Sequence, residues 1–484
     1  MNAPATLLPS HKTKIVCTIG PASDSVEIME RMLHAGMNIA RLNFSHGDFD
    51  THGRNIRNLR EASHRSGHRI TIMADLSGPK MRIGKLGQEP IELRTDDRFI
   101  LTTEEIVGDA TRTSVSFKRL PDVVQPANIL YLNDGIVQLE VERVDGADVR
   151  CRVLVGGELR SHKGLNIPGI DLGISAFTDN DRKCLEFALG QGVDAVSQSF
   201  VESAADINAV RQAAASLGHH PFIIAKIERS RALANLDAIL EASDGVMIAR
   251  GDLGVEIPIE QIAVIQKQIM LQANRLGKPA ITATQMLESM TLSRIPTRAE
   301  ATDVANAIID GTDAVMLSGE SAMGKYPVEA VTMLARIAAA TEPQLPRRYV
   351  REAIHESDKH RTIRPSDLIS LGLETMLEYA TPMLVVVPTR SGETARRIAR
   401  FKLPVWIAAV SSQESTCRHL QFSYGVLPIQ EAKLPDDWNQ YVRARLVSAG
   451  VKEGTVMLVE GPSSRRPDAN HRIELLDMGR LTRS

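Results

Sequence analysis

The sequence predicts an α/β protein: a (β/α)8 TIM barrel that carries a small inserted β-barrel lid domain and is followed by a C-terminal α/β domain. Three features predict this architecture. Short apolar runs alternate with helical patterns from residue 14 to about residue 340, one interruption alternates like antiparallel strands, and the α/β pattern returns after a polar stretch. At 484 residues the chain also exceeds what a single hydrophobic core usually serves.

Eight short apolar runs supply the strands of the predicted barrel. Each is bounded by polar residues, as expected for a buried parallel strand. The runs are Lys14–Gly20, Asn38–Ser45, Ile70–Leu76, Ala195–Phe200, Phe222–Glu228, Gly245–Asp252, Pro279–Gln285 and Ala314–Ser318. Eight consecutive βα units favour a closed barrel, with an open doubly wound sheet as the alternative.

Helical patterns fill the intervals between these strands. Thr297-Arg-Ala-Glu300 follows Pro296 and has the capping-box pattern that begins a helix. Residues Ile259–Leu276 carry one apolar stripe, formed by Ile262, Ile265, Ile269, Ala273 and Leu276.

The alternation of barrel strands and helices is interrupted once, after the third strand. Val137, Leu139 and Val141 alternate with polar residues, and the turn Asp145-Gly146 leads to a second alternating run, which is typical of a β-hairpin. An insert in this loop lies at the barrel rim, where it is placed to act as a lid. The chain therefore divides into barrel (1–77), lid (78–163), barrel (164–342) and C-terminal regulatory α/β domain (343–484), the last after a polar linker, Pro343–Pro365.

Composition narrows the functional classes. The 57 basic and 59 acidic residues nearly balance and form no long one-sign run, which argues against binding to nucleic acid or to a membrane surface. No segment approaches the ~18 apolar residues of a membrane span, and the N-terminus lacks the apolar core of a signal peptide. Four widely spaced cysteines (Cys17, Cys151, Cys184 and Cys417) indicate buried thiols in a cytoplasmic protein.

Polar side chains follow the barrel strands at the end where active sites of such barrels lie. Glu228 and Asp252 end two neighbouring strands, and Lys226 lies two residues before Glu228 on the same side. Two carboxylates beside an ammonium suit Mg²⁺ or Mn²⁺ together with an anionic substrate. The full set is Arg41, Asn43, Ser45, Asp75, Lys226, Glu228, Arg250, Asp252, Thr284 and Glu320.

These residue types indicate phosphoryl transfer. A divalent ion can bridge a carboxylate and an enolate or phosphoryl oxygen, while Lys226 and Arg41 neutralise phosphoryl charge. Arg82 adds a planar guanidinium suited to phosphate, and the Thr284 hydroxyl is placed to relay a proton.

Six sequence blocks between residue 14 and about residue 330 resemble the pyruvate kinase family. They are long and occur in the family's order. The blocks are Lys14-Ile-Val-Cys-Thr-Ile-Gly-Pro-Ala, Asn38-Ile-Ala-Arg-Leu-Asn-Phe-Ser-His-Gly, Ala225-Lys-Ile-Glu, Ile248-Ala-Arg-Gly-Asp-Leu-Gly-Val-Glu, Ala283-Thr-Gln-Met-Leu-Glu-Ser-Met and Met316-Leu-Ser-Gly-Glu-Ser-Ala.

The resemblance implies a homotetrameric enzyme that transfers the phosphoryl group of phosphoenolpyruvate to ADP, giving pyruvate and ATP. It implies that Glu228 and Asp252 hold the divalent metal and that Lys226, Arg41 and Arg82 contact the phosphoryl group. It also implies that the backbone of Ala249, Arg250 and Gly251 holds the substrate carboxylate, that Thr284 takes part in protonating the enolate, and that Asn43, Ser45, Asp75 and Leu76 belong to a K⁺ site.

One departure from the family concerns that K⁺ site. Where many members read Asp-Thr-Lys-Gly-Pro-Glu, this chain has Asp75-Leu-Ser-Gly-Pro-Lys80. An acid has become a base, and a lysine ammonium can occupy the space of the monovalent cation. We therefore predict that K⁺ is not required; the alternative is that Lys80 is a solvated surface residue.

Two further regions qualify the resemblance. Ser199-Phe200 is followed by Val201-Glu202-Ser203, where many members have a basic pair near the nucleotide phosphates. In the C-terminal domain, the loop of Thr389, Arg390, Ser391, Gly392 and Thr394 resembles the family's effector loop, which implies activation by a sugar phosphate or AMP; an ordinary βα turn would look similar.

Two other functions remain open from the sequence. A metal-dependent lyase or aldolase acting on an enolate would share the Glu228 and Asp252 pair without needing ADP or a lid. A catalytically silent sensor would bind metabolites through its C-terminal domain. Such a protein would be free to lose the polar residues of the rim, so their presence argues against this alternative.

Overall fold

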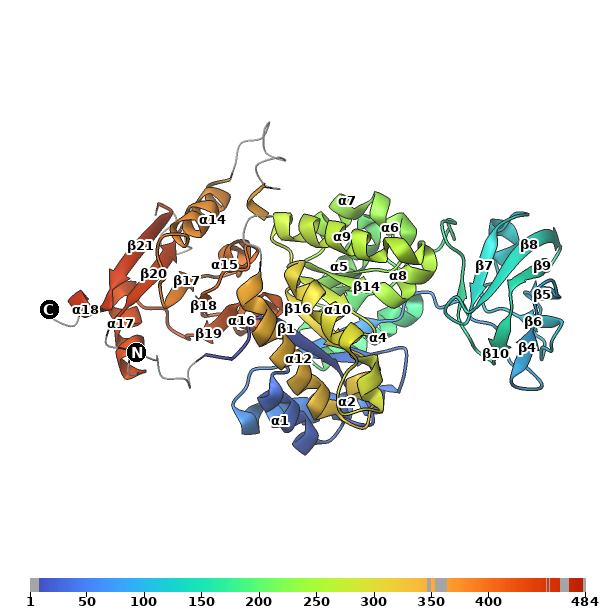
Figure 1. Ribbon diagram of the computed structural model, residues 1–484, viewed down its shortest axis with the longest axis horizontal. Helices are drawn as coiled ribbons and strands as arrows, with labels where there is room; N and C mark the ends of the chain where they lie inside the picture. The colour runs from blue at the N-terminus through green and yellow to red at the C-terminus, as the bar shows by residue number, and fades with distance from the viewer. Residues whose placement is uncertain are drawn as a thin grey trace.

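The computed structural model describes residues 8–345, 350–352, 364–449, 451, 453–461 and 470–481. Three parts follow one another along the long axis: a C-terminal α/β part, a central barrel and a β insert (Figure 1). Most of the predicted linker Pro343–Pro365 lies outside the described residues.

The central part is a closed barrel of eight parallel strands, which confirms the prediction and excludes the open sheet. The strands run in chain order around the barrel, and β16 closes it by pairing with β1, Lys14 opposite Ala314. They are β1 (Lys14–Thr18), β2 (Ile39–Asn43), β3 (Thr71–Leu76), β12 (Ala195–Gln198), β13 (Phe222–Ile227), β14 (Gly245–Ala249), β15 (Ala280–Ala283) and β16 (Ala314–Leu317).

Seven of the eight predicted strands end later than the observed strands, and the run of residues 245–252 overshoots furthest. β14 stops at Ala249, and Arg250 begins helix α8 (Arg250–Glu256). Asp252 therefore lies in the first helical turn rather than on a strand, so its predicted location at a strand end is wrong. An acidic residue in the first turn is favoured by the helix dipole, which explains why the strand gives way to a helix here.

Helices cover the outside of the barrel. Thr297 and Glu300 form the predicted capping box of α10, and the predicted helix over residues 259–276 is a short 3₁₀ turn (Ile259–Gln261) followed by α9. The helices are α1 (Val26–Ala35), α2 (Phe49–Ser66), α4 (Asp179–Gly190), α5 (Ala204–Ser216), α6 (Ser230–Ala234), α7 (Leu236–Ala242), α8, α9 (Ile262–Leu276), α10 (Arg298–Ile309), α11 (Gly319–Ala322) and α12 (Pro327–Thr341).

The insert after β3 forms a six-stranded sheet and a two-stranded sheet around its own apolar core. The predicted hairpin is present as β8 and β9, with Val137, Leu139 and Val141 buried. The elements are β4 (Ile91–Leu93), β5 (Arg98–Thr102), β6 (Arg112–Ser114), α3 (Leu120–Val123), β7 (Ile129–Leu132), β8 (Val137–Asp145), β9 (Asp148–Val155), β10 (Gly157–Leu159) and β11 (Leu165–Asn166).

The C-terminal part is a five-stranded sheet in the order β19-β18-β17-β20-β21, in which only β21 is antiparallel among the described strands. Its strands are β17 (Leu384–Pro388), β18 (Trp406–Ser411), β19 (Val426–Gln430), β20 (Thr455–Glu460) and β21 (Arg472–Asp477). Its helices are α14 (Pro365–Met376), α15 (Glu393–Ala399), α16 (Glu414–His419), α17 (Trp438–Ser448) and α18 (Met478–Leu481).

This sheet domain packs against the amino ends of the barrel strands, opposite the insert (Figure 1). Phe422 joins the apolar side chains inside the barrel and stacks on Phe222 with ring centroids 5.1 Å apart. Lys402 forms an ion pair of 2.7 Å with Asp313, just before β16. The carboxyl ends of the barrel strands, at the opposite end, therefore face the insert and carry the predicted site.

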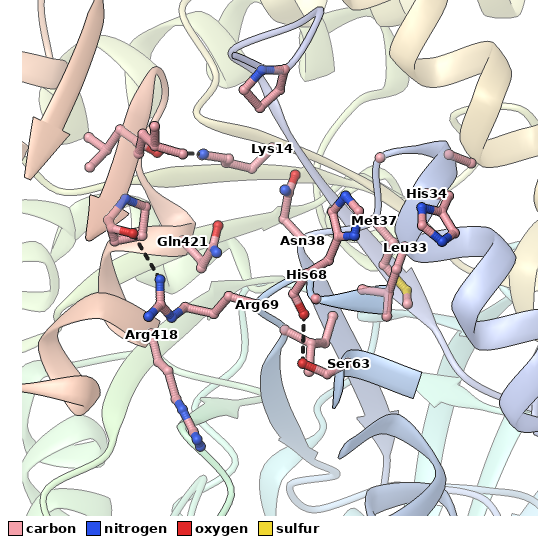
Figure 2. Close-up of a pocket in the computed structure, with 18 of the residues that line it drawn as sticks. Lys14, Leu33, His34, Met37, Asn38, Ser63, His68, Arg69, Arg418 and Gln421 are labelled. Carbon is pink, nitrogen blue, oxygen red and sulfur yellow. Dashed lines mark hydrogen bonds between the residues drawn. The ribbon is translucent and has the colours of Figure 1, made fainter. Parts of the chain in front are cut away.

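A pocket of about 910 Å³ lies at this junction. Figure 2 shows Lys14, Asn38 and His68 of the barrel facing Arg418 and Gln421 of the C-terminal domain. Ion pairs cross the same junction: Arg418 to Asp194 at 2.8 Å and Arg69 to Glu414 at 3.1 Å. Within the described residues, no helix is both long and apolar enough to cross a bilayer.

Candidate active site

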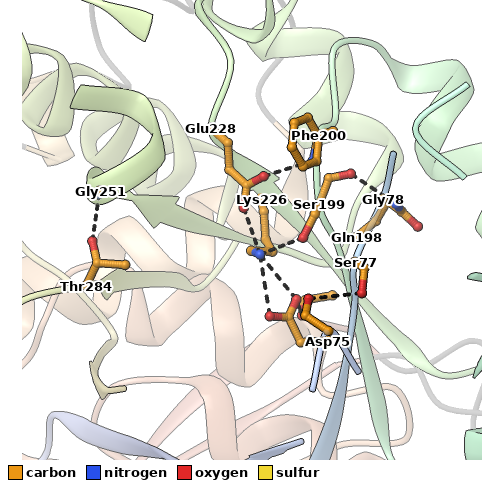
Figure 3. Close-up of polar contacts among 12 residues, drawn as sticks. Asp75, Ser77, Gly78, Gln198, Ser199, Phe200, Lys226, Glu228, Gly251 and Thr284 are labelled. Carbon is orange, nitrogen blue, oxygen red and sulfur yellow. Dashed lines mark hydrogen bonds and ion pairs between the residues drawn. The ribbon is translucent and has the colours of Figure 1, made fainter. Parts of the chain in front are cut away.

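Lys226 is the centre of the polar cluster at the rim (Figure 3). Its Nζ lies 2.7 Å from Oε1 of Glu228, donates to Oγ of Ser199 at 2.6 Å, and lies 3.4 Å from the Asp75 carboxylate. Burial acts to lower the pKa of Lys226, but the charges of Asp75 and Glu228 outweigh it and raise this pKa above its ordinary value. The side chain therefore stays a buried ammonium.

Asp75 joins Lys226 to Arg41. Its carboxylate accepts hydrogen bonds from Nε of Arg41 at 2.8 Å and from Oγ of Ser197 at 2.6 Å. Burial alone would raise the pKa of Asp75, but Lys226 and Arg41 lower it to about 2. The carboxylate therefore remains charged and fixes both cations at the rim.

Of the predicted carboxylate pair, Glu228 directly follows β13 and Asp252 lies in the first turn of α8. Oε2 of Glu228 accepts from the backbone N–H of Phe200 at 3.0 Å, which orients it. Burial, and then the charge of Glu228, raises the pKa of Asp252 to about 6, so the two acids are close enough to repel each other. Asp252 is exposed to solvent, but the protein atoms around its carboxylate still reduce its hydration.

This pair fits a hard divalent cation. Both donors are carboxylate oxygens, the ligands that Mg²⁺ and Mn²⁺ prefer. Among the described residues, no three His, Cys, Asp or Glu side chains converge as a metal cluster. Glu228 and Asp252 would hold the ion, and water and substrate oxygens would complete the coordination.

Cationic side chains gather beside the pair. The pKa of Lys80 is lowered by burial and then by Arg82 and Lys226, although its side chain keeps solvent contact. The pKa of His46 is lowered by burial and by Lys80, Arg82 and Arg41. No acid of the described residues lies within ion-pair distance of the Lys80 ammonium, so this side of the rim is positive and suited to an anion.

The predicted monovalent-cation residues lie around the same strand ends. Oδ1 of Asn43 accepts from the backbone N–H of Ser45 at 3.1 Å, and Oγ of Ser45 lies 3.0 Å from Oγ of Ser77. The Leu76 carbonyl accepts from the Ser199 N–H at 3.3 Å. The Asp75 carboxylate of this set is held by Arg41, Lys226 and Ser197, as described above.

Thr284 lies across the rim, beside the first turn of α8. Its Oγ1 accepts from the Gly251 N–H at 2.8 Å and donates to the Ala283 carbonyl at 2.7 Å (Figure 3). The Arg250 guanidinium leaves the rim and pairs with Asp303 at 2.7 Å, so only its backbone belongs to the predicted substrate segment.

Several residues of the site were missed by the sequence reasoning. Ser199 and Ser197 bind Lys226 and Asp75, and Thr18 accepts from Arg41 at 2.9 Å. All three carry hydroxyl groups in or next to barrel strands, a signal that a search for charged strand ends ignores. Glu320 is fully buried and accepts from the backbone N–H groups of Leu287 and Ser318, which is a structural role.

The Glu202 departure has a structural explanation. Its carboxylate pairs with Nε of Arg229 at 3.2 Å and with Nε of Arg231 at 3.1 Å. Burial raises the pKa of Glu202, partly opposed by these two arginines. Glu202, just before α5, therefore belongs to an ion-pair network. It does not offer positive charge to a nucleotide.

The predicted effector loop lies between β17 and α15, far from the rim. Oγ1 of Thr389 accepts from the Gly392 N–H at 2.9 Å, and the Arg390 carbonyl accepts from Oγ1 of Thr416 at 2.6 Å. Gly392 has a φ of 79°, which favours glycine at this turn. Ser391 is exposed and Thr394 is half-buried, so both can be reached from solvent.

A (β/α)8 barrel with paired carboxylates, a buried lysine and arginines at one rim has the features of a phosphotransferase. The family model described as the pyruvate kinase barrel domain matches residues 10–331, and that of the pyruvate kinase alpha/beta domain matches residues 373–467. The chain belongs to the pyruvate kinase family and is a kinase.

Individual relatives agree over nearly the whole chain. A pyruvate kinase of Thermococcus litoralis is 47% identical over 460 residues, covering 94% of this chain and 96% of the relative. One from Geobacillus stearothermophilus is 44% identical, covering 86% of this chain and 71% of the relative. The crystal structure of a pyruvate kinase from Cryptosporidium parvum superposes with a TM-score of 0.89 at 34% identity, covering 97% of this chain and 96% of that one.

Proposed function

We propose that this protein transfers the phosphoryl group of phosphoenolpyruvate to ADP, giving pyruvate and ATP, with Mg²⁺ or Mn²⁺ at Glu228 and Asp252. The observation that supports this most directly is the buried Lys226 ammonium, 2.7 Å from Glu228 and beside the pair of Asp75 and Arg41. When bound, the metal supplies Lewis-acid stabilisation of the substrate oxygens.

The remaining residues bind and orient the substrate. Lys226, Arg41 and Arg82 neutralise the phosphoryl oxygens, since phosphoryl transfer depends mainly on positioning and charge. The backbone of Ala249, Arg250 and Gly251 binds the substrate carboxylate, where the N-terminus of α8 favours negative charge.

Thr284 acts after phosphoryl transfer. As the phosphoryl group leaves for an ADP oxygen, the C2–O electrons remain as an enolate. A proton relayed through the Thr284 hydroxyl adds to C3, and C2–O becomes the carbonyl of pyruvate. The hydroxyl is already held at the rim by Gly251 and Ala283.

Pyruvate release from phosphoenolpyruvate tests the reaction. With Mg²⁺ present, we expect release that depends on ADP and stops when EDTA removes the metal. Release without ADP would indicate the lyase or aldolase, and the absence of release under all conditions would indicate the silent sensor.

We also propose that catalysis does not require K⁺, because Lys80 supplies the positive charge. Burial lowers the pKa of Lys80, Arg82 and Lys226 lower it further, and Asp75 and Asp252 raise it, which supports a role for its charge beside the rim groups. In buffer free of K⁺, Na⁺ and NH₄⁺, we expect the wild type to turn over fully and Lys80→Glu to depend on added K⁺. Strong K⁺ activation of the wild type would contradict the proposal.

The loop of Thr389, Ser391 and Thr394 is our proposed site for an activating phosphorylated metabolite, a sugar phosphate or AMP. The exposed Ser391 and the half-buried Thr394, at the start of α15, support it. A panel of these metabolites should lower the phosphoenolpyruvate concentration needed for half-saturation, and Ser391→Asp should abolish the effect. An unchanged saturation curve across the panel would contradict this site.

Finally, we propose a cytoplasmic homotetramer divided as predicted, into 1–77 and 164–342 (barrel), 78–163 (lid) and 343–484 (regulatory). Three strongly exposed apolar side chains support self-association: Leu292 at 71%, Ile295 at 68% and Met323 at 78% exposure. Light scattering should give four times the monomer mass of 53.0 kDa. A monomer at micromolar concentration would refute the tetramer.

A further inference from the structure

The backbone at Thr284 is strained. Thr284 has a φ of 66° and the next residue, Gln285, a φ of 53°. A β-branched residue rarely adopts this left-handed conformation, which is unfavourable and persists only where surrounding contacts impose it. Thr284 also carries the hydroxyl assigned to proton relay, so whatever imposes this conformation also aims that hydroxyl.

The Arg250 guanidinium holds the two carbonyls of this turn. Its Nε donates to the Ala283 carbonyl at 3.2 Å and its Nη2 donates to the Thr284 carbonyl at 2.9 Å. Arg250 is also the first residue of α8, directly before Gly251, whose N–H donates to Oγ1 of Thr284. Arg250 thus affects both partners of the hydrogen bond between Gly251 and Thr284. It directly precedes Gly251 in the chain, and its guanidinium binds the backbone carbonyl of Thr284.

Asp303 fixes Arg250 from behind. Its two carboxylate oxygens accept from Nη1 and Nη2 of Arg250, each at 2.7 Å, which is the bidentate geometry of a strong guanidinium–carboxylate pair. Asp303 lies on α10, which begins at the Thr297 cap, and is 53 residues from Arg250 along the chain. Among the described residues, no other acid lies within 4 Å of this guanidinium.

We infer that Asp303 is a positioning residue for the proton-transfer half of the reaction. It acts through Arg250 on the backbone of Thr284 and does not touch the substrate. Loss of its charge frees the guanidinium to rotate, the Thr284 turn relaxes, and Oγ1 leaves the position from which it relays a proton to C3. Phosphoryl transfer at Lys226, on the other side of the rim, is affected less.

The inference rests on the proposed role of Thr284, so the test measures proton transfer directly. The enzyme is incubated with pyruvate, Mg²⁺ and ATP in D₂O, and exchange of the methyl protons is followed by NMR. Phosphoenolpyruvate turnover and KM are measured in parallel. We expect Asp303→Asn to slow exchange about tenfold, with the KM for phosphoenolpyruvate within twofold of wild type, and Asp303→Glu to recover at least half of the exchange rate.

Asp237→Asn is the matched control. It makes the same chemical change in an exposed ion pair, that of Asp237 with Arg275 at 3.3 Å, on the outer helices of the barrel. It should leave exchange unchanged and shift Tm by no more than a few degrees. If Asp303→Asn lowers exchange and turnover equally, or only in proportion to lost folded protein, the positioning role is refuted.

The Thr284→Val variant distinguishes failure of the Asp303 inference from failure of the proton-relay role of Thr284. If this variant loses exchange while Asp303→Asn keeps it, the inference about Asp303 fails and the role of Thr284 stands. If Thr284→Val keeps full exchange, the proton-relay role fails, and the inference about Asp303 fails with it.

Discussion

At the scale of single residues, the site pairs opposite charges so that each group stays ionised in the interior. Asp75 is nearly inaccessible to solvent, yet its pKa is about 2, because Lys226 and Arg41 lie against it. Lys226 in turn keeps its proton because two carboxylates surround it. A group deprived of either partner would shift toward its neutral form, since an unpaired buried charge is costly.

The first residue-scale prediction concerns Lys226 itself. Lys226→Met removes the ammonium but keeps the length of the side chain, so kcat should fall on the order of 10³-fold, the effect typical of losing one preorganised charge in a site. Lys267→Met removes an exposed lysine that pairs with Asp310 on the outer helices, and it should keep full turnover. A Lys226→Met enzyme with near-normal kcat would show that the cluster has been misassigned.

The second concerns Ser199, which the charged-residue pattern overlooked. Ser199→Ala removes the 2.6 Å hydrogen bond to Lys226 and should lower kcat about tenfold, because hydrogen bonds to charged groups contribute about 1.5–3 kcal/mol. Ser216→Ala, at the end of α5, removes a hydroxyl that bonds only to the local Ala213 carbonyl and serves as the control. Equal kinetics in the two variants would remove Ser199 from the site.

At the scale of elements, Arg229 connects the segment that returns from the lid to the end of β13 and to α8. Among the described residues it is the largest fully buried side chain, and it directly follows Glu228. Its Nη1 lies 3.4 Å from Glu256 at the end of α8, and its Nη2 donates to the Ile170 carbonyl at 3.2 Å, in the segment that returns from the insert. The lid connection, β13 and α8 therefore meet at one guanidinium.

Arg229→Met should destabilise the protein by about 3–5 kcal/mol, because it leaves Glu256 buried without its cation. Urea unfolding followed by fluorescence would measure the change. Adding Glu256→Leu should recover most of the loss, since a buried ion pair is often replaceable by apolar groups.

Arg231→Met is the comparison for Arg229→Met. Arg231 lies nearer the surface, paired with Asp171 at 3.0 Å, and such pairs contribute at most about 1 kcal/mol. Similar losses for Arg229→Met and Arg231→Met would mean that burial does not govern the strength of this network.

The elements also show where sequence reasoning succeeds. The strand ends at Lys226 and Glu228 were predictable because a short apolar run stopped abruptly on charge. Asp252 was assigned to the right place but to the wrong element, since the run of residues 245–252 gives no sign that a helix begins at Arg250. Nor could the sequence reveal the positive φ of Thr284, because β-branched residues almost never adopt it.

At the scale of the whole molecule, the junction between barrel and C-terminal domain holds a buried cation. Lys14, at the start of β1, donates to the Val426 carbonyl at 2.7 Å and lies 5.5 Å from the Trp406 ring centroid. Burial lowers the pKa of Lys14 to about 8. The pair of Arg418 with Asp194 across this junction joins residues 224 positions apart in the chain. Such pairs cannot be predicted from local sequence patterns.

This junction should give a specific pH dependence. Between pH 8 and about 10.5 the unfolded chain binds the Lys14 proton more tightly than the folded protein does, so this group's contribution to stability rises with pH in that window. The Tm of wild type relative to Lys14→Met should therefore rise from pH 8 to pH 10. A difference in Tm that stays constant over this range would show that Lys14 titrates normally.

The closure of the barrel has a consequence for the nascent chain. Oγ1 of Thr18 donates to the Leu317 carbonyl across 299 residues, so the first strand to leave the ribosome completes its pairing only after the last barrel strand has emerged. At typical synthesis rates of about 5–20 residues per second, β1 stays without this partner for roughly 15–60 s. During that interval a half-built barrel exposes apolar strand edges, and translation speed and chaperone access then decide how much of the protein reaches its native state.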